Sequence, residues 1–110
     1  MIDYSDFEKV DIRVGTIIEA KLNQKSNKPS IYLVINFGDE IGKKKTSAQL
    51  TKNYLSEELI GKQVAAVINF PPKQIGKMVS EVLVLGFPDE NNNPVLVMPS
   101  IKISNGVKLF

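Results

Sequence analysis

Residues 69–81, with the sequence NFPPKQIGKMVSE, decide how this chain is expected to fold. An apolar run at residues 63–70 leads into the two prolines, and a second apolar run at residues 80–87 follows the lysines. Proline lacks the N–H group that a central strand must donate, so the first strand is expected to end here. The stretch therefore predicts two strands joined by a rigid, basic loop.

The first strand of the fold is expected to begin at residue 12, where apolar and polar residues start to alternate. Its buried face is predicted to carry Ile12, Val14, Ile18, Ala20 and Leu22. Gly15 lies inside this strand, where a residue without a side chain lets a strand bend around a small barrel. A merely local weakness in the strand is the alternative interpretation.

Three further strands are predicted from the same pattern, at residues 31–37, 44–50 and 95–98. Ser5 and Glu8 have the spacing of a capping box, which predicts a single helical turn near the N-terminus. Ser56 and Gly61 are placed to begin and end a second short helix. The chain is thus expected to be all-β with short helices. The order of elements is that of a five-stranded Greek-key barrel of the oligonucleotide-binding type, followed by a C-terminal β extension.

Length and composition indicate one ordinary globular domain. The chain has 110 residues, 43% of them hydrophobic and 24% charged, which allows one core without metal or disulfide support. It contains no cysteine, and residues 1–6 are acidic, unlike the start of a signal peptide. The apolar runs are too short to cross a bilayer. We expect a single domain over residues 1–110 that lies in the cytoplasm and does not insert into a membrane.

The residues required for most catalytic chemistry are missing. The sequence has no histidine and no cysteine, which excludes the common nucleophile and base pairs and the common metal ligands. It contains neither a Walker loop nor a GxGxxG fingerprint. The pair Asp39 and Glu40 falls at an expected hairpin turn, where solvated carboxylates are usual. We therefore expect no catalytic residue, no metal, no cofactor and no enzyme activity.

Lysine residues are distributed unevenly, although the net charge is only +2. Most of them fall in three groups that contain no acidic residue: Lys21, Lys25 and Lys28; Lys43, Lys44, Lys45 and Lys52; Lys62, Lys73 and Lys77. Each group by itself is typical of solvated loops. Together they indicate a basic surface on particular loops of one barrel.

Two segments, DIRVG at residues 11–15 and NFPPKQIGKMVSE at residues 69–81, resemble the tRNA-binding domain family. Members of this family are small barrels of the oligonucleotide-binding type, either appended to aminoacyl-tRNA synthetases or free-standing. The resemblance continues through NFG at 36–38, SAQ at 47–49, SEVLVLG at 80–86 and NG at 105–106. It implies the same barrel for this chain.

Two departures from the synthetase-type pattern favour the CsaA group, which comprises stand-alone, dimeric members described as export-related chaperones. The chain has Pro72-Lys73-Gln74 where appended domains usually carry Pro-Arg-Lys, and Ser80-Glu81-Val82-Leu83 where they usually carry Ser-Glu-Gly-Met. The resemblance implies a homodimer that binds unfolded or precursor polypeptides, with the protein-export machinery as a further candidate partner. The alternative is a tRNA-binding protein, because the expected surface is basic.

The residues expected to contact a polypeptide or tRNA lie on the first and third strands and on the loop after the prolines. They are Arg13, Lys43, Lys44, Lys45, Ser47, Gln49, Asn69, Lys73, Ile75, Lys77, Met78 and Ser80. In relatives the matching loop is implicated in RNA contact, which implies that role for Lys73, Lys77 and Ser80. Ile75 and Met78, with Val79, edge a groove suited to an apolar peptide.

Structural roles are the alternatives for three of these residues. Arg13 is equally compatible with an ion pair to an acid such as Asp11 or Glu81. Asn69 has the spacing to bond the turn that follows it. Ser80 is placed either to cap the start of a strand or to meet a ligand backbone.

Aromatic residues give little support to base stacking. Phe7, Phe37 and Phe70 have the parity of core residues, which leaves Tyr32 and Tyr54 as stacking platforms. Nucleic-acid binding would then depend on phosphates and be weak, with a dissociation constant of roughly 10⁻⁴ to 10⁻⁶ M.

An apolar surplus follows in the last third of the chain. Residues 82–85 and 95–98 are apolar at both parities, more than one buried face per strand requires. Covering the open end of the barrel is one use for the surplus, and a subunit interface is the other. We favour the interface, because members of the CsaA group pair through this part of the chain.

Overall fold

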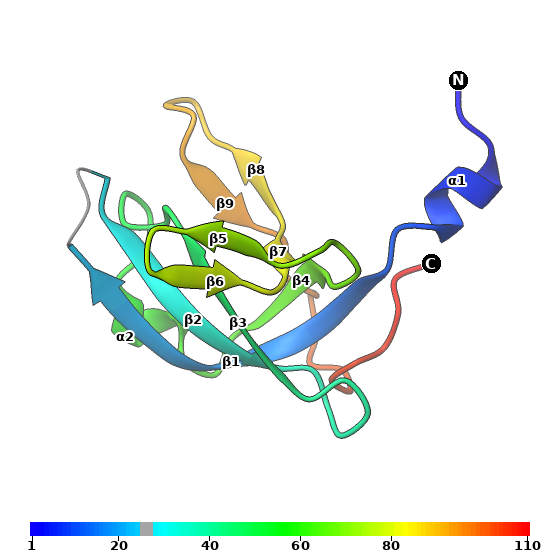
Figure 1. Cartoon of the computed structure of the whole chain (residues 1–110), viewed down its shortest axis with the longest axis horizontal. Helices are drawn as coiled ribbons and strands as arrows, with labels where there is room; N and C mark the ends of the chain where they lie inside the picture. The colour runs from blue at the N-terminus through cyan, green and yellow to red at the C-terminus, as the bar shows by residue number, and fades with distance from the viewer. Residues whose placement is uncertain (25–27) are drawn as a thin grey trace.

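The computed structural model describes residues 1–24 and 28–110, so Lys25 lies outside the described residues. Five antiparallel strands form one strongly curled sheet in the order β3-β2-β1-β4-β7 (Figure 1). These strands are β1 (Ile12–Asn23), β2 (Ser30–Asn36), β3 (Lys43–Ala48), β4 (Gln63–Val67) and β7 (Leu83–Val84). The sheet confirms the expected five-stranded barrel of the oligonucleotide-binding type.

Two hairpins and two short helices complete the described chain (Figure 1). They are the hairpin of β5 (Lys73–Ile75) and β6 (Met78–Ser80), the hairpin of β8 (Gly86–Pro88) and β9 (Pro94–Leu96), and the helices α1 (Tyr4–Glu8) and α2 (Ser56–Leu59). Both expected helical segments are present. In α1 the amide of Asp3 donates to Asp6 Oδ2 at 3.0 Å, so the cap begins two residues earlier than the expected pair of Ser5 and Glu8. Gly61 follows α2 with a φ of 91°, as a helix-ending glycine requires.

Strand β1 forms the centre of the sheet because it pairs with β2 and with β4. A bulge between Ile17 and Glu19 shifts its register against β2. Val14 is buried and Ala20 packs against the core, as predicted, but the predicted parity is wrong at Ile17, Ile18 and Leu22. Ile17 is fully buried in the core, whereas Ile18 is half-buried and Leu22 is exposed.

The opposite face of β1 is covered by the C-terminal segment. Val14 is buried there, and its amide donates to Val107 O at 3.3 Å. The amides of Gly106 and Leu109 donate to Val14 O and Ile12 O at 2.8 and 2.9 Å. The tail thus continues the sheet along the part of β1 that β2 leaves open, and this brings the C-terminus near α1 (Figure 1).

The barrel core is built from the alternate residues of β2 that the sequence predicted. Ile31, Leu33 and Ile35 are buried, and Phe37 follows them in the core as expected. Thr46 on β3 is the buried polar residue beside them, and its hydroxyl donates to Val82 O at 2.8 Å. This bond ties β3 to the chain that closes the barrel.

The strand expected at residues 80–87 is divided into separate pieces. Ser80 ends β6, and the amide of Glu81 then donates to Lys45 O at 2.8 Å, which closes the barrel against β3. β7 pairs with β4, and β8 pairs with β9. The segment changes partner three times, so one continuous strand is excluded. Similarly, β4 ends at Val67, short of the predicted end at residue 70.

No helix among residues 1–24 and 28–110 is long and apolar enough to span a membrane.

We expect Gly15→Ala to destabilise the barrel. A Cβ at Gly15 would lie 2.6 Å from Ile35 Cγ2 and 2.8 Å from Phe37 Cδ1, and both side chains are held in the core. Such overpacking costs about 1–3 kcal/mol in the free energy of unfolding. Urea denaturation followed by circular dichroism measures this cost, with Glu19→Ala on the exposed side of the same strand as the control. Equal stability of Gly15→Ala and the wild type would show that the core has room at this position.

Candidate ligand-binding groove

A groove lies between β3 and the chain on both sides of the β5–β6 hairpin. Its volume is about 720 Å³. It is lined by residues 46–48, residues 70–75 and residues 80–84, and we call it the β3 groove. A second hollow of about 670 Å³ shares Ser47, Ala48, Ile75 and Leu83 with it and adds Gln49 and Lys28. The two hollows together follow one side of β3 to its end.

Three large apolar side chains in the β3 groove are half exposed. The exposed fraction is 52% for Phe70, 48% for Ile75 and 50% for Leu83. The expectation that Phe70 lies in the core is therefore wrong, because β4 ends before it and the strand parity no longer applies. These side chains offer an apolar lining to a ligand.

The structure brings together only part of the predicted site. Ser47, Lys73, Ile75 and Ser80 line the β3 groove, and Gln49 lines the second hollow. The other predicted residues line neither: Arg13, Lys43, Lys44, Lys45, Asn69, Lys77 and Met78. Phe70, Glu81 and Leu83 line the β3 groove and were not predicted. The proline after Phe70 was the available signal, since it marks the point where strand parity ends.

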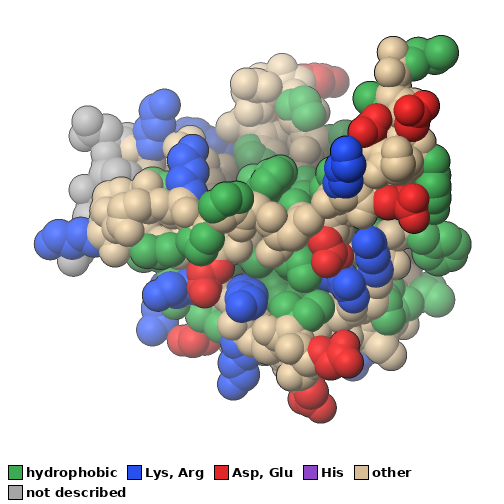
Figure 2. All heavy atoms as spheres, turned by 45° about the vertical axis from the view of Figure 1, so that its right-hand side comes forward, with side chains coloured by type: hydrophobic (Ala, Val, Ile, Leu, Met, Phe, Trp, Pro, Cys, Tyr) green, Lys and Arg blue, Asp and Glu red, His purple; other side chains and the backbone are tan. Residues whose placement is uncertain are grey.

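The positively charged side chains are dispersed over several elements of the fold. Lys43 and Lys45 are exposed on β3, Lys73 begins β5, and Lys77 lies at the turn between β5 and β6. On the face shown in Figure 2, Lys and Arg side chains lie among acidic and apolar ones and form no single basic patch. Tyr54, one of the two expected stacking platforms, packs against the core, and its hydroxyl accepts from Leu96 N at 3.0 Å.

Ser80 and Glu81 are engaged with β3 by their side chains. The amide of Ser47 donates to Ser80 Oγ at 3.2 Å, and the amide of Lys45 donates to Glu81 Oε1 at 3.0 Å. The hydroxyl of Ser47 in turn donates to Ser30 Oγ at 3.1 Å. Ser80 therefore bonds the backbone of β3 in this structure, and it does so from inside the groove.

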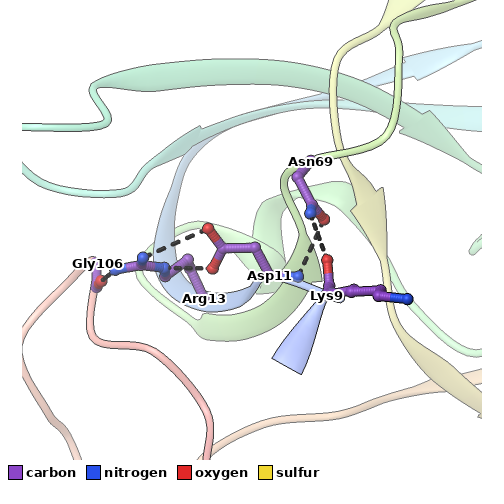
Figure 3. Close-up of polar contacts among 5 residues, drawn as sticks. All are labelled: Lys9, Asp11, Arg13, Asn69 and Gly106. Atoms are coloured by element: carbon purple, nitrogen blue, oxygen red, sulfur yellow. Dashed lines mark hydrogen bonds and ion pairs between the residues drawn. The ribbon is translucent and has the colours of Figure 1, made fainter. Parts of the chain in front are cut away.

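Arg13 makes the structural ion pair that was one of its two interpretations (Figure 3). Its Nε donates to Asp11 Oδ1 at 2.6 Å, and its Nη1 donates to Gly106 O at 2.9 Å. The hydrogen bond to Asp11 raises the pKa of Arg13 above its ordinary value. Arg13 thus fastens the C-terminal segment to β1, away from the β3 groove.

Asn69 links the end of β4 to the chain before β1 (Figure 3). Its Oδ1 accepts from the amide of Asp11 at 3.0 Å, and its Nδ2 donates to Lys9 O at 2.7 Å. The partner is thus a distant segment and not the adjacent turn that was expected. By fixing residue 69, this pair of bonds sets where Phe70 and the two prolines leave the barrel.

Carboxylates do not gather into a cation site in the described part of the chain. No group of three or more Asp, Glu, His or Cys side chains is placed to hold a metal ion among residues 1–24 and 28–110.

The fold and the groove define a small binding barrel of the oligonucleotide-binding type, with its candidate ligand surface at β3 and the β5–β6 hairpin. Residues 12–108 match the family described as "Putative tRNA binding domain", and the chain belongs to this family.

Two solved structures resemble the whole chain closely. The chaperone CsaA from Bacillus anthracis strain Ames is 44% identical with a TM-score of 0.94, and the match covers 100% of this chain and 99% of that one. The CsaA chaperone protein from Picrophilus torridus is 48% identical with a TM-score of 0.92, and the match covers 100% of both chains. The suspected likeness to the CsaA group is confirmed.

Curated relatives include methionine–tRNA ligases. The enzyme from Porphyromonas gingivalis strain ATCC 33277 is 33% identical over 105 residues, which is 96% of this chain but 15% of the ligase. The chain therefore spans about 15% of the length of these relatives.

We expect Asn69→Ala to lower the free energy of unfolding by about 1–2 kcal/mol, because two hydrogen bonds between distant segments are lost. Urea denaturation measures the change, and hydrogen exchange of the Asp11 amide reports it locally. Asn91→Ala, in the exposed turn between β8 and β9, is the matched control. Unchanged exchange at Asp11 would show that the bond to Asn69 does not hold this segment in solution.

Proposed function

We propose that this protein is a CsaA-like, export-related chaperone that binds unfolded or precursor polypeptides as a homodimer in the cytoplasm. The observation that carries this proposal is the apolar lining of the β3 groove by Phe70, Ile75 and Leu83. Non-native chains expose apolar side chains, and covering apolar surface contributes about 25 cal/mol per Å². The likeness to the two CsaA structures over the whole chain supports the same function. The protein-export machinery is the partner that we propose for delivery of the bound chains.

Binding of tRNA is the second candidate, and it is favoured by the family and by the methionine–tRNA ligase relatives. Lys73 is the lysine that lines the β3 groove, while Lys43 and Lys45 lie on β3 and Lys77 at the turn of the β5–β6 hairpin. Contact of these lysines with phosphates would make binding steeply dependent on salt. Glu81 also lines the groove and opposes a polyanion there.

We expect Ile75→Ser to weaken binding of an unfolded polypeptide about three- to tenfold, because half of this side chain is available for burial in the complex. Reduced and carboxymethylated lactalbumin is a suitable probe, followed by fluorescence anisotropy. Ile60→Ser is the matched control: Ile60 is 52% exposed, against 48% for Ile75, and it lies next to α2 outside the groove. An equal loss of affinity for the polypeptide in both variants would contradict binding in the groove.

Salt dependence separates the two candidate functions. Binding of the unfolded polypeptide should change little with salt and survive Lys73→Ala, because an apolar groove releases few counterions. Each lysine that meets a phosphate should instead contribute about 0.7 to 0.9 to the slope of log affinity against log salt. Tight tRNA binding that is lost in Lys73→Ala, without affinity for unfolded chains, would make tRNA binding the function.

The proposed homodimer is based on apolar side chains that remain exposed near the C-terminus. The core takes up part of the expected surplus, because Val82 and Leu96 are buried. The apolar side chains that stay exposed there include Met98, Ile101, Val107, Leu109 and Phe110. Several of these line a separate groove of about 350 Å³, which lies on the outer face of β1 and is distinct from the β3 groove and the second hollow. A second copy of this chain is the occupant that we propose for this surface.

We expect Leu109→Ser to raise the dissociation constant of the dimer in sedimentation velocity at micromolar concentration. The substitution keeps the backbone bond from Leu109 N to Ile12 O, whereas deletion of the tail would also uncover Val14. Leu55→Ser is the control, since Leu55 is an exposed leucine beside α2. A wild-type protein that stays monomeric at high concentration would contradict the dimer.

A further inference from the structure

The two edges of β3 are satisfied in different ways. Along the inner edge, β3 pairs with β2 from Lys43 to Ala48. On the outer edge the backbone of residues 1–24 and 28–110 supplies one bond, from Glu81 N to Lys45 O. The outward N–H groups of Lys45 and Ser47 donate to side-chain oxygens instead, Glu81 Oε1 and Ser80 Oγ. Two side chains therefore occupy the places where the carbonyl groups of a neighbouring strand would lie.

Residue 81 therefore occupies the outer edge at Lys45, whereas at Ser47 the edge is capped by a side chain and not paired. A strand edge with free N–H and C=O groups is a template for another extended chain. Side-chain caps leave the edge by rotation about single bonds, whereas a paired strand must move as a whole. Exchange of a hydroxyl acceptor for a carbonyl acceptor also replaces one hydrogen bond by another, so its net cost is small.

The space for such a chain lies directly beside the capped edge. Residues 46–48 of β3 line the β3 groove, and residues 47–49 line the second hollow that continues it. Ile75 and Leu83 line both hollows, and Phe70 lines the first. An extended chain along the outer edge would thus have an apolar lining on the side opposite to β3.

The lining of this space favours a polypeptide over a nucleic acid, although its charges are mixed. Glu81 and Lys73 line the β3 groove, and Lys28 lines the second hollow. Phe70 is the one aromatic residue that lines either hollow, so base stacking has little support there. A peptide backbone supplies a carbonyl oxygen for the N–H group of Ser47, and its apolar side chains match Ile75 and Leu83.

We propose that an extended segment of unfolded polypeptide binds as an added strand along the outer edge of β3, between Ser47 and Gln49. One of its carbonyl oxygens replaces Ser80 Oγ on the Ser47 amide. Alternate side chains then point into the groove and contact Ile75 and Leu83. The inference rests on the proposed function and adds the mode of binding and the chemistry of the ligand, an extended backbone with alternating apolar side chains.

Substitution of Ser80 tests the exchange of acceptors. Ser80→Ala removes the side-chain acceptor of the Ser47 amide in the free protein, so a ligand carbonyl group no longer has to displace it. We expect a soluble peptide of alternating valine and threonine between lysine ends to bind about three- to tenfold more tightly, measured by calorimetry. Ser56→Ala on α2 is the matched control, because Ser56 lines neither hollow. Unchanged or weaker binding in Ser80→Ala would overturn the added strand.

A second measurement uses the backbone of the same peptide. N-methylation of alternate residues blocks one edge of an extended peptide and leaves its side chains unchanged. One peptide is methylated on the valine amides and the other on the threonine amides, so each has a different edge blocked. Their affinities should differ by about tenfold or more, because only one edge of the peptide can face β3 while the valines face the groove. Equal affinities would show that side chains alone are recognised.

Ile75→Ser distinguishes failure of this inference from failure of the proposed function. If the peptide binds and Ile75→Ser weakens it, while Ser80→Ala and methylation have no effect, groove binding stands and strand addition is wrong. If the wild type binds no peptide, or binds only RNA in this groove, both proposals are wrong.

Discussion

The close packing of Gly15 against Ile35 and Phe37 is the contact on which the barrel depends. Strand β1 must pair with β4 at one end and β2 at the other, which requires it to curve around the core. The missing side chain at Gly15 makes room for Phe37, and the bulge after Ile17 turns the second half of the strand so that Ala20 packs against the core. A Cβ at Gly106 would meet the carbonyl of Phe37, so the same packing also fixes the path of the C-terminal tail.

The groove follows from how this curved sheet closes. Closure needs a partner for the outer edge of β3, and the chain provides it with one backbone bond from Glu81 and with the side chains of Ser80 and Glu81. The chain that forms the other wall leaves β4 at Asn69, where bonds to Lys9 and Asp11 hold it. The two prolines after Phe70 cannot pair, so the β5–β6 hairpin stands away from the sheet and the space between them remains open. Asn69 thus sets the position of the groove wall without lining the groove itself.

The sequence predicted the parts of the fold that depend on local patterns. Residues 31–37 alternate cleanly, and their apolar members form the core. The change of parity in β1 after Ile17 could not be predicted, because the bulge there depends on pairing with β2 and leaves no local signal. The segment at residues 80–87 has a uniform apolar pattern that hides its three changes of partner. For the site, residue types at loop positions predicted Lys73 and Ile75 in the groove. The position of Arg13 and of the β3 lysines outside the groove could not be predicted in this way, because contacts between distant segments determine it.

Barrel closure and ligand binding, as proposed, compete for the amide of Ser47 on β3. This amide is already bonded to Ser80 Oγ in the free protein, so a ligand carbonyl group gains only the difference between the two hydrogen bonds. Affinity must then come mainly from apolar contact with Ile75, Leu83 and Phe70, each of which is only half exposed before binding. A ligand held in this way binds weakly and leaves readily, and its sequence matters little beyond alternate apolar residues. These are the properties needed to hold a non-native chain and release it without a nucleotide-driven step.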